Sequence, residues 1–236
     1  MNGKIYLIPT PLGEDVLPTI PQYVVDTIHG IDTFIVERAK TARHFIKATT
    51  PPYPLSILTI FEIDQEKLDI QNIDYQEVKS ILEQGKNIGL MSEAGCPGVA
   101  DPGAKVVAWC HRQGFEVVPL VGPSAILLAL MGSGMNGQSF AFQGYLSAKR
   151  VDLGKELKRL EDLARRLNQT QIFIEAPYRN KQVIETALQN LSPQTLFCIA
   201  ADLTLPPQYL VTKTIAEWQK TAIPDLHKHA AIFLIG

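Results

Sequence analysis

Short β-like runs alternate with helix-period segments through the first half of this 236-residue chain, and this alternation limits the fold more than any other feature. Parallel strands need long crossover connections, so the alternation predicts a parallel sheet with flanking helices on both faces. Strands are predicted at residues 4–8, 33–37, 87–91 and 116–120, with a weaker prediction at 55–60. Apolar residues at spacings of three and four predict helices at residues 21–29, 41–48, 75–84 and 104–113.

The second half of the chain, after Gly144, has fewer crossovers and more neighbouring strands, which favours a mixed sheet. Helices are predicted at residues 151–167 and 179–190, and strands at 171–175, 196–201, 209–212 and 230–235. We therefore predict an α/β protein of two domains. The N-terminal parallel-sheet domain spans residues 1–115 and the C-terminal mixed-sheet α/β domain spans residues 116–236.

Composition restricts the partners and the compartment. The net charge is −2, so the protein as a whole does not attract nucleic acid electrostatically. Any contact with RNA must therefore come from a local basic patch. Cys96, Cys110 and Cys198 lie far apart without a paired spacing, which argues against a zinc site and a disulfide framework. The first residues lack the features of a secretory signal, so we expect a cytoplasmic protein.

Residues 117–135 carry no charge over a length close to that of a membrane span. Pro119, Gly122, Pro123 and Ser124 interrupt the first half of this segment, and such residues punctuate strand-to-helix joins. We interpret it as a buried strand, a tight turn and a buried helix, with no membrane insertion. Ser124 is then placed to cap the helix, whose free amides also favour an anion.

Three loops rich in glycine and proline follow three of the predicted strands, at residues 9–13, 92–103 and 121–124. Ligands of open α/β sheets bind outside the carboxyl ends of the strands, where such loops converge. Glycine allows close backbone approach and proline fixes loop shape. Glu93 and Asp101 are the charged residues of these loops. The loops therefore favour a ligand held by backbone bonds and apolar contact over a triphosphate.

Other motifs fail on their context. The GxGxxG match at residues 132–137 follows a predicted helix and precedes a strand-like segment, so it lacks the dinucleotide-binding arrangement. His227 and His229 have no third candidate ligand nearby, which favours surface histidines over a metal site. No metal is therefore predicted. The chain also has no GxSxG elbow and no Walker lysine.

The three loops and a later segment together resemble a known family. IYLIPTPLG, SEAGCPGVADPG, VVPLVGPSAILLAL and FQGYLSAKR are similar, in order, to the motifs of the tetrapyrrole (corrin/porphyrin) methylase superfamily. The similarity is greatest to the branch that methylates a cytidine ribose 2'-hydroxyl in ribosomal small-subunit RNA. The resemblance implies S-adenosyl-L-methionine bound in a cleft between the two domains, and a homodimer.

The resemblance also implies site residues. Matched motif by motif, it puts cofactor contacts at Thr10, Pro11, Leu12, Gly95, Cys96, Val99, Ser124, Ala125, Ile174, Glu175, Ala201 and Ala230. A ribose hydroxyl is a weak nucleophile that gains from a base, for which Glu37 at a strand end is the candidate. The alternative is that Glu37 pairs locally with Arg38 or Lys40. The candidate phosphate-binding residues are Lys40, Arg43, Lys149, Arg150 and Arg179.

Departures from the family pattern leave the acceptor open. Cys96 stands where porphyrin-type members have Asp and the RNA branch has Thr, so a small uncharged residue leans toward RNA. Residues 37–44 and 176–179 are similar to RNA-branch motifs but altered. A tetrapyrrole-like or other small-molecule acceptor is one alternative, and a cofactor-binding paralogue is another. The seven basic and four acidic residues of segment 149–166 fit either an RNA-binding surface or a solvated helix face.

Overall fold

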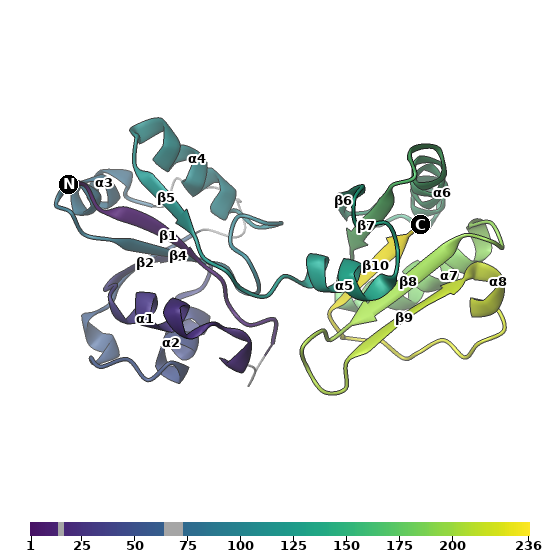
Figure 1. The fold of residues 1–236 in the computed structure, drawn as a ribbon, viewed down its shortest axis with the longest axis horizontal. Helices are drawn as coiled ribbons and strands as arrows, with labels where there is room; N and C mark the ends of the chain where they lie inside the picture. Colours follow the sequence, from purple (N-terminus) through teal and green to yellow (C-terminus); the bar gives the residue numbers. More distant parts are fainter. Residues whose placement is uncertain (14–16, 64–72) are drawn as a thin grey trace. The chain divides into compact units, whose positions relative to one another are not determined.

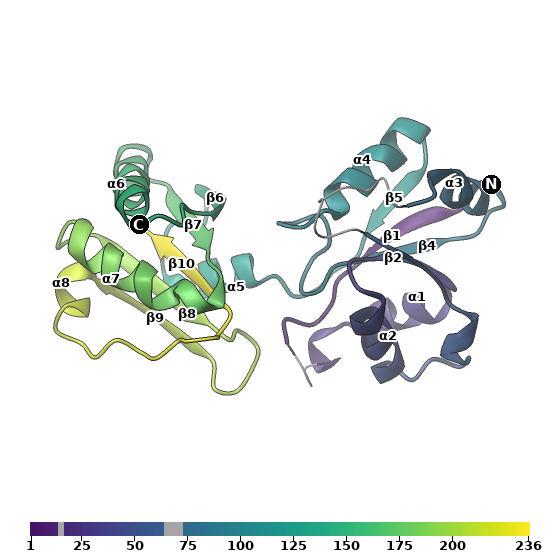
Figure 2. The ribbon, with the colours of Figure 1, turned by 180° about the vertical axis from the view of Figure 1, so that it is seen from behind.

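The computed structural model describes residues 1–13, 17–63 and 73–236, which form two compact units, Met1–Ser124 and Ala125–Gly236. Figures 1 and 2 show the ribbon from opposite sides. The predicted division between residues 115 and 116 comes too early in the chain. The reason is strand β5 (Glu116–Pro119), which pairs in parallel with β1 (Lys4–Ile8) and completes the sheet of the first unit.

The first unit is built on a five-stranded sheet in the order β3-β2-β4-β1-β5. Its pairings are parallel throughout, which confirms the predicted sheet type. The strand order reverses at β1, because the chain runs from β1 to one side and later crosses β1 to reach β5. This reversal makes β4, β1 and β5 neighbours. The remaining strands are β2 (Thr33–Val36), β3 (Thr59–Glu62) and β4 (Ile88–Met91).

Helices cover both faces of this sheet. Helices α1 (Gln22–His29) and α2 (Ala39–Ala48) pack apolar residues against one face, and α3 (Tyr75–Glu83) and α4 (Gly103–Gln113) against the other (Figure 1). The weaker strand prediction at 55–60 is wrong in its first half. Turn hydrogen bonds after Pro54 form the 3-10 helix η2 (Leu55–Ile57) before β3 begins. A further 3-10 helix, η1 (Leu17–Thr19), precedes α1.

The second unit contains a five-stranded sheet in the order β6-β7-β10-β8-β9. Strands β6 and β7 are parallel and the other pairings are antiparallel, which confirms the predicted mixed sheet. The short helix α8 was not predicted; a capping box formed by Thr214 and Glu217 begins it. The elements are α5 (Ala125–Ser133), β6 (Phe140–Tyr145), α6 (Arg150–Leu167), β7 (Thr170–Ile174), η4 (Pro177–Arg179), α7 (Asn180–Asn190), β8 (Leu196–Ala201), β9 (Tyr209–Thr214), α8 (Ile215–Trp218) and β10 (Ala231–Ile235).

Helices α6, α7 and α8 bury their apolar residues on one face of this sheet, and α5 packs on β9 and β10. Gly132 permits that close packing, because a Cβ there would lie 2.3 Å from Leu210 Cδ1. The uncharged segment 117–135 thus forms the predicted strand, turn and helix, but the predicted burial is wrong in part, because Leu127 and Met131 of α5 are exposed. Among the described residues, no helix is long and apolar enough to cross a membrane. The GxGxxG match spans the last two residues of α5 and the loop before β6, so it follows a helix and precedes a strand, as predicted.

Candidate active site

The three glycine- and proline-rich loops lie at one edge of the first sheet. They follow β1, β4 and β5, which are neighbouring parallel strands, so their carboxyl ends share that edge. The predicted convergence of the loops is therefore confirmed. A crevice of this kind, outside the carboxyl ends of strands at a reversal of strand order, is where open α/β sheets bind ligands.

The first and second loops are joined through their backbones. The N–H of Thr10 donates to the C=O of Gly95 at 2.9 Å, and the N–H of Gly95 donates to the C=O of Thr10 at 3.0 Å. The buried Thr10 hydroxyl adds a 3.2 Å bond to the carbonyl of Ser92. Three hydrogen bonds therefore hold two loops that are more than eighty residues apart in a single arrangement.

The third loop packs against the other two. The Cys96 thiol contacts the carbonyl of Pro123 at 3.4 Å. A Cβ on Gly122 would lie 2.2 Å from Cγ of Pro9, so only glycine allows this approach to the first loop. Burial raises the pKa of the Cys96 thiol. A thiol that resists ionisation is a poor nucleophile, and Cys96 packs here as a small uncharged residue against the third loop.

Asp101 shapes the long second loop. Its carboxylate accepts hydrogen bonds from the N–H of Gly98 at 2.9 and 2.8 Å and from the N–H of Gly103 at 2.6 Å. Burial raises the pKa of Asp101, and the backbone N–H groups act in the opposite direction. Gly98 and Ala100 have positive φ values of 85° and 61°. The carboxylate thus holds a tight loop whose backbone conformation would otherwise be costly.

A pocket of about 450 Å³ opens beside the first loop. It is lined mainly by the first loop, the start of the second loop and helix α2. The lining includes the predicted cofactor residues Thr10, Pro11 and Leu12. Cavities of this size bind small molecules in many proteins. The other lining residues are Gly13, Leu17, Thr41, Ala42, His44, Phe45, Ala48, Ser92, Glu93 and Ala94.

Helix α2 presents two different faces beside this pocket. Thr41, His44, Phe45 and Ala48 line it, at the spacings of three and four that mark one side of a helix. The exposed basic residues Lys40 and Arg43 belong to the adjacent side. The prediction from sequence singled out these two cations and missed Thr41 and His44, although the helical spacing could have found them.

Glu37 has a structural hydrogen bond in this arrangement. Its Oε1 accepts from the N–H of Glu93 at 3.0 Å and so fixes the start of the second loop. The Glu93 carboxylate, which lines the pocket, accepts a 3.2 Å bond from the Thr41 hydroxyl and lies 4.0 Å from the Arg38 guanidinium. One partner of Glu37 is therefore a backbone N–H of a distant loop, and not the neighbouring Arg38 or Lys40 that the alternative to the base supposed.

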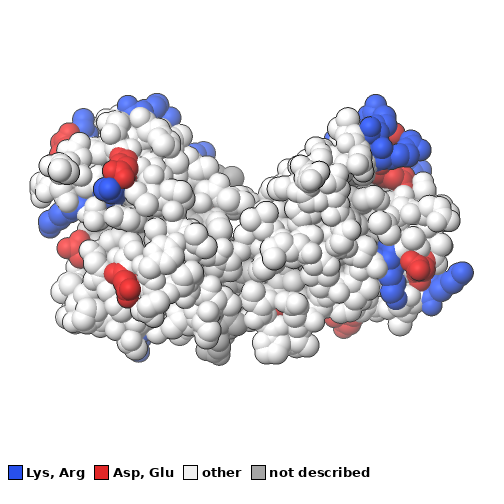
Figure 3. Space-filling view, in the orientation of Figure 1, with Lys and Arg blue, Asp and Glu red and all other residues white. Residues whose placement is uncertain are grey.

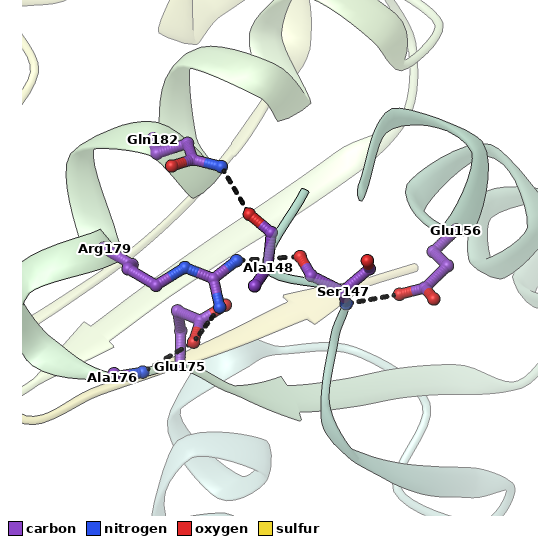
Figure 4. A network of polar contacts seen from close by, with 7 residues as sticks. All are labelled: Ser147, Ala148, Glu156, Glu175, Ala176, Arg179 and Gln182. Atoms are coloured by element: carbon purple, nitrogen blue, oxygen red, sulfur yellow. Dashed lines mark hydrogen bonds and ion pairs between the residues drawn. The ribbon is translucent and has the colours of Figure 1, made fainter. Parts of the chain in front are cut away.

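In the second unit, Glu175 and Arg179 form a buried ion pair (Figure 4). Arg179 Nη1 lies 3.1 Å from Glu175 Oε1, and the two side chains are 12% and 1% exposed. Arg179 Nη2 also donates to the carbonyl of Ser147 at 2.7 Å. Because these donors serve buried partners, Arg179 does not present the free guanidinium expected of a phosphate-binding residue.

The network around Arg179 fixes the loop between β6 and α6. Ser147 donates its N–H to Glu156 at 2.8 Å, and Gln182 donates to the carbonyl of Ala148 at 3.3 Å (Figure 4). Exposed Lys149 follows directly. Lys and Arg side chains gather over α6 (Figure 3), although Arg150 pairs with Glu185 at 3.6 Å. The loop therefore holds the exposed Lys149 on a rigid support, next to the basic residues of α6.

The cofactor residues predicted in the second half of the chain gather at one edge of the mixed sheet. Ile174 ends β7, Ala201 ends β8, and Ala230 directly precedes β10, which pairs with both strands. Glu175 follows at the same edge, and its Oε2 is buried without a hydrogen-bond partner among the described residues. Of the remaining predicted positions, Val99 is 49% exposed on the second loop, and Ser124 and Ala125 stand at the start of α5.

Comparison with solved structures identifies the fold. The methyltransferase CobJ superposes with a TM-score of 0.63 at 20% identity, covering 99% of this chain and 94% of CobJ. Diphthine synthase gives a TM-score of 0.68 at 11% identity, covering 99% of this chain and 89% of its own. Identities this low support the fold alone. No family model matches the sequence.

Curated relatives are similar in sequence as well. Ribosomal RNA small subunit methyltransferase I of Bacillus subtilis is 31% identical over 218 residues, covering 91% of this chain and 68% of the relative. The Vibrio cholerae protein of the same name is 32% identical over 209 residues, with coverage of 86% and 66%. The chain spans about two thirds of the length of these relatives.

The fold is that of the solved methyltransferases CobJ and CbiF, and the identity to curated ribosomal RNA methyltransferases defines the chain as a methyltransferase with this fold. Within this class, the chain belongs to the ribosomal RNA small subunit methyltransferase I family. The resemblance found in the sequence motifs is therefore confirmed, both for the superfamily and for the branch.

Proposed function

We propose that this protein transfers a methyl group from S-adenosyl-L-methionine to a ribose 2'-hydroxyl of small-subunit ribosomal RNA. The single observation that carries the proposal is that the three loops are joined at the β4-β1-β5 edge of the sheet. The curated relatives of this chain are named ribosomal RNA small subunit methyltransferase I. A protein that acts on ribosomal RNA would work in the cytoplasm. The three cysteines agree with this location, because they lie far apart in the sequence without the paired spacing of a disulfide framework.

The loops fit the proposed cofactor chemically. A sulfonium compound carries a positive centre, an adenosine and an amino-acid end, and it needs backbone partners and apolar walls more than opposing charges. Gly95 supplies such a backbone position with a φ of +76°. We propose cofactor contacts at Thr10, Pro11, Leu12, Gly95, Cys96, Val99 and Ser124 of the first unit, and at Ala125, Ile174, Glu175, Ala201 and Ala230 of the second.

The unpartnered Glu175 Oε2 supports a ligand contact in the second unit. A buried acceptor without a donor costs free energy, about 1–3 kcal/mol for such a group. A hydroxyl or amine of the bound ligand would remove that cost. The Arg179 ion pair would hold the carboxylate in place for this contact.

The pocket beside the first loop supports a place for part of the acceptor nucleotide. Its volume of about 450 Å³ suits a group of that size. The exposed cations Lys40 and Arg43 flank it on α2, and we propose that they contact RNA phosphates together with Lys149. Arg150 contributes less directly, because Glu185 already pairs with it.

The chemistry asks mainly for orientation. When bound, the cofactor supplies an electrophilic methyl group on a sulfonium sulfur. The chain's task is to hold the acceptor oxygen in line with that methyl, and positioning alone can supply several kcal/mol. The rigidly joined loops support such positioning. Glu37 contributes through its Oε1, which accepts from the N–H of Glu93 and so fixes the start of the second loop.

Labelled S-adenosylmethionine tests the function directly. Purified protein is incubated with small ribosomal subunits from a strain that lacks this gene, and with a small-molecule extract of the same strain. We expect label in ribosomal RNA, and we expect this RNA to resist alkaline cleavage at the one methylated nucleotide. Label only in the extract would favour the small-molecule alternative, and binding without transfer would favour a cofactor-binding paralogue. Light scattering of the same sample checks the proposed homodimer.

A further inference from the structure

Helix α6 (Arg150–Leu167) has one face in the core of the second unit and another face turned away from it. Its buried residues recur at spacings of three and four, which place them on one side of the helix. They are Leu153, Gly154, Leu157, Leu160 and Ala164. This side packs against α7 and the sheet, so the opposite side is held in place along a helix about 27 Å long.

The side of α6 that is turned away from the core carries mostly cations. Its lysines and arginines are all exposed, and with one aspartate they recur at the same helical spacings. We call this set the outward face of α6; it consists of Lys155, Lys158, Arg159, Asp162, Arg165 and Arg166. Figure 3 shows Lys and Arg side chains gathered over this helix. The whole chain has a net charge of −2, so the outward face differs in sign from the protein that carries it.

Two acidic residues of α6 are bound to neighbouring segments of the second unit. Glu156 accepts a hydrogen bond from the N–H of Ser147 at 2.8 Å. Glu161 accepts from the N–H of Ser192 at 2.7 Å and from the hydroxyl of Thr195. These carboxylates thus hold the segments before α6 and before β8, and they do not belong to the outward face.

The other acidic residues of α6 form exposed ion pairs. Asp152 lies 3.9 Å from Lys155, and Asp162 lies 3.0 Å from Arg165 and 2.8 Å from Arg166. Exposed ion pairs of this kind add little stability, because water and salt screen them. A phosphate could therefore replace these carboxylates as the partner of the cations.

Lys158 and Arg159 have no such pair within the described part of the chain. They follow Lys155 by three and four residues, and like charges at these spacings destabilise a helix. Arg165 and Arg166 lie in the last turn, where cations favour the helix dipole. Lys158 and Arg159 lie in the middle of the helix, so the dipole does not account for them. A charge arrangement that costs helix stability indicates a binding role for these two residues.

We propose that the outward face of α6 binds the phosphate backbone of ribosomal RNA, with Lys158 and Arg159 as its main contacts. The proposal rests on the proposed function for the identity of the RNA. Ribosomal RNA is long, so a contact at α6 needs no particular distance from the nucleotide that is methylated. The contact raises the affinity for the substrate and takes no part in methyl transfer.

The composition of α6 favours phosphates over bases and RNA over a membrane. The helix has no aromatic residue on which a base could stack, so the contact is independent of base sequence. A basic helix that lies on a membrane inserts its apolar side into the lipid. The leucines that form the apolar side of α6 are buried in the core of the second unit instead.

The double variant Lys158→Gln/Arg159→Gln tests the proposal by filter binding of small-subunit ribosomal RNA. At about 50 mM salt the affinity falls about tenfold or more, and the slope of log affinity against log salt becomes less steep by about 1.4–1.8. The KM for RNA rises, while kcat at saturating RNA and the affinity for S-adenosylhomocysteine stay unchanged. The control is Arg112→Gln/Lys220→Gln, which removes one exposed arginine and one exposed lysine elsewhere and keeps the wild-type slope.

Asp162→Asn gives a second test, in which affinity increases. It removes the acidic residue of the outward face and releases Arg165 and Arg166 from their pairs. The affinity for RNA at about 50 mM salt therefore rises about twofold or more. A loss of folding could not produce such a gain. Glu83→Gln is the matched control, because it removes an exposed carboxylate that pairs with Lys79 on α3, and it leaves the affinity at the wild-type value.

The outcomes distinguish this proposal from the proposed function. If the wild type labels ribosomal RNA and the double variant keeps its KM and salt slope, the role of α6 is wrong and the proposed function stands. If the wild type binds RNA through Lys158 and Arg159 but labels none, the proposed function fails and the RNA-binding surface stands. Vesicles of phosphatidylglycerol and phosphatidylcholine test the other polyanionic partner. Loss of vesicle binding without loss of RNA binding in the double variant would overturn the assignment to RNA.

Discussion

Thr10 and Gly95 exchange a pair of backbone hydrogen bonds, at 2.9 and 3.0 Å, that join the loops after β1 and β4. This antiparallel bridge at the edge of a parallel sheet depends on the left-handed backbone of Gly95, whose φ is +76°. The backbone conformation of this one glycine therefore determines how the first two loops of the candidate site are held together.

Gly95→Ala should weaken cofactor binding. A side chain at this φ costs about 1–2 kcal/mol, and the new Cβ would lie 3.3 Å from Leu12 Cδ2 and 3.5 Å from the carbonyl of Pro123. Relief of that crowding moves the first and third loops. We expect the affinity for S-adenosylhomocysteine, measured by calorimetry, to fall about tenfold or more, since a factor of ten corresponds to about 1.4 kcal/mol.

Gly134→Ala is the matched control for this change. Gly134 has a φ of +71°, and a Cβ added there would meet nothing within 4 Å, so the backbone cost is similar and the crowding is absent. Both variants should lose similar stability, and only Gly95→Ala should lose affinity. Equal affinities in the two variants would show that the bridge does not shape the binding site.

The sequence predicts the converging loops because strand polarity can be read from it. Once the strands at residues 4–8, 87–91 and 116–120 are taken as parallel, their following loops must share an edge. The strand order could not be read in the same way. Nothing local in the sequence shows that β5 pairs with β1, and this missing long-range pairing is why the predicted domain division came too early.

Side-chain partners are harder to predict, because charge in a sequence does not show burial. The sequence suggests phosphate binding for Arg179, yet Glu175, four residues earlier, lies at a buried sheet edge and pairs with it. Glu37 similarly bonds to the backbone of Glu93, across 56 residues. Thr41 and His44 were within reach of helical periodicity, but the prediction rested on the charge of the adjacent Lys40 and Arg43.

Arg179→Met should destabilise the protein strongly. It leaves the Glu175 carboxylate buried without its cation, and breaking a buried pair from one side costs about 3–5 kcal/mol. Urea unfolding measures the change. Glu175→Gln combined with Arg179→Met should recover part of the loss, because the uncompensated charge is gone.

Arg165→Met provides the comparison for the buried pair. Arg165 is 80% exposed in its contact with Asp162, and exposed pairs contribute about 0–1 kcal/mol. A loss of stability in Arg179→Met no larger than in Arg165→Met would contradict a structural role for the Glu175–Arg179 pair.

Lys149→Glu should weaken RNA methylation without changing cofactor affinity. Lys149 is exposed and directly follows the loop that Arg179 and Gln182 hold, and no ion pair among the described residues engages it. The logarithm of the affinity falls linearly with the logarithm of the salt concentration, and losing one phosphate contact makes this slope less steep by about 0.7–0.9. Filter binding measures the affinity for ribosomal RNA at salt concentrations from about 50 to 200 mM.

Lys220→Glu changes the net charge equally at an exposed position after α8 and serves as the control. Its salt slope should match the wild type. If both substitutions weaken RNA binding equally, the loss of affinity comes from the change in net charge and not from a contact made by Lys149. If Lys149→Glu also lowers cofactor affinity, the separation of RNA and cofactor contacts fails.

Asp101→Asn should change how stability depends on pH. Burial raises the pKa of Asp101 above its ordinary 3.8, so the native protein binds this proton more tightly than the unfolded chain. The group's contribution to the free energy of unfolding is therefore largest below that ordinary value. It falls as pH rises through the raised pKa and is level above it. Asparagine removes this dependence, while its Oδ1 can still accept from Gly98 and Gly103.

Unfolding of the wild type and Asp101→Asn in urea across the acidic range isolates this group, because the other carboxyls cancel in the difference. Wild-type stability minus that of the variant should fall with rising pH and then become constant, since the proton bound more tightly by the native state is lost over that range. A difference that rises with pH would mean that the backbone N–H groups outweigh burial, and that Asp101 holds the second loop mainly as a stabilised anion.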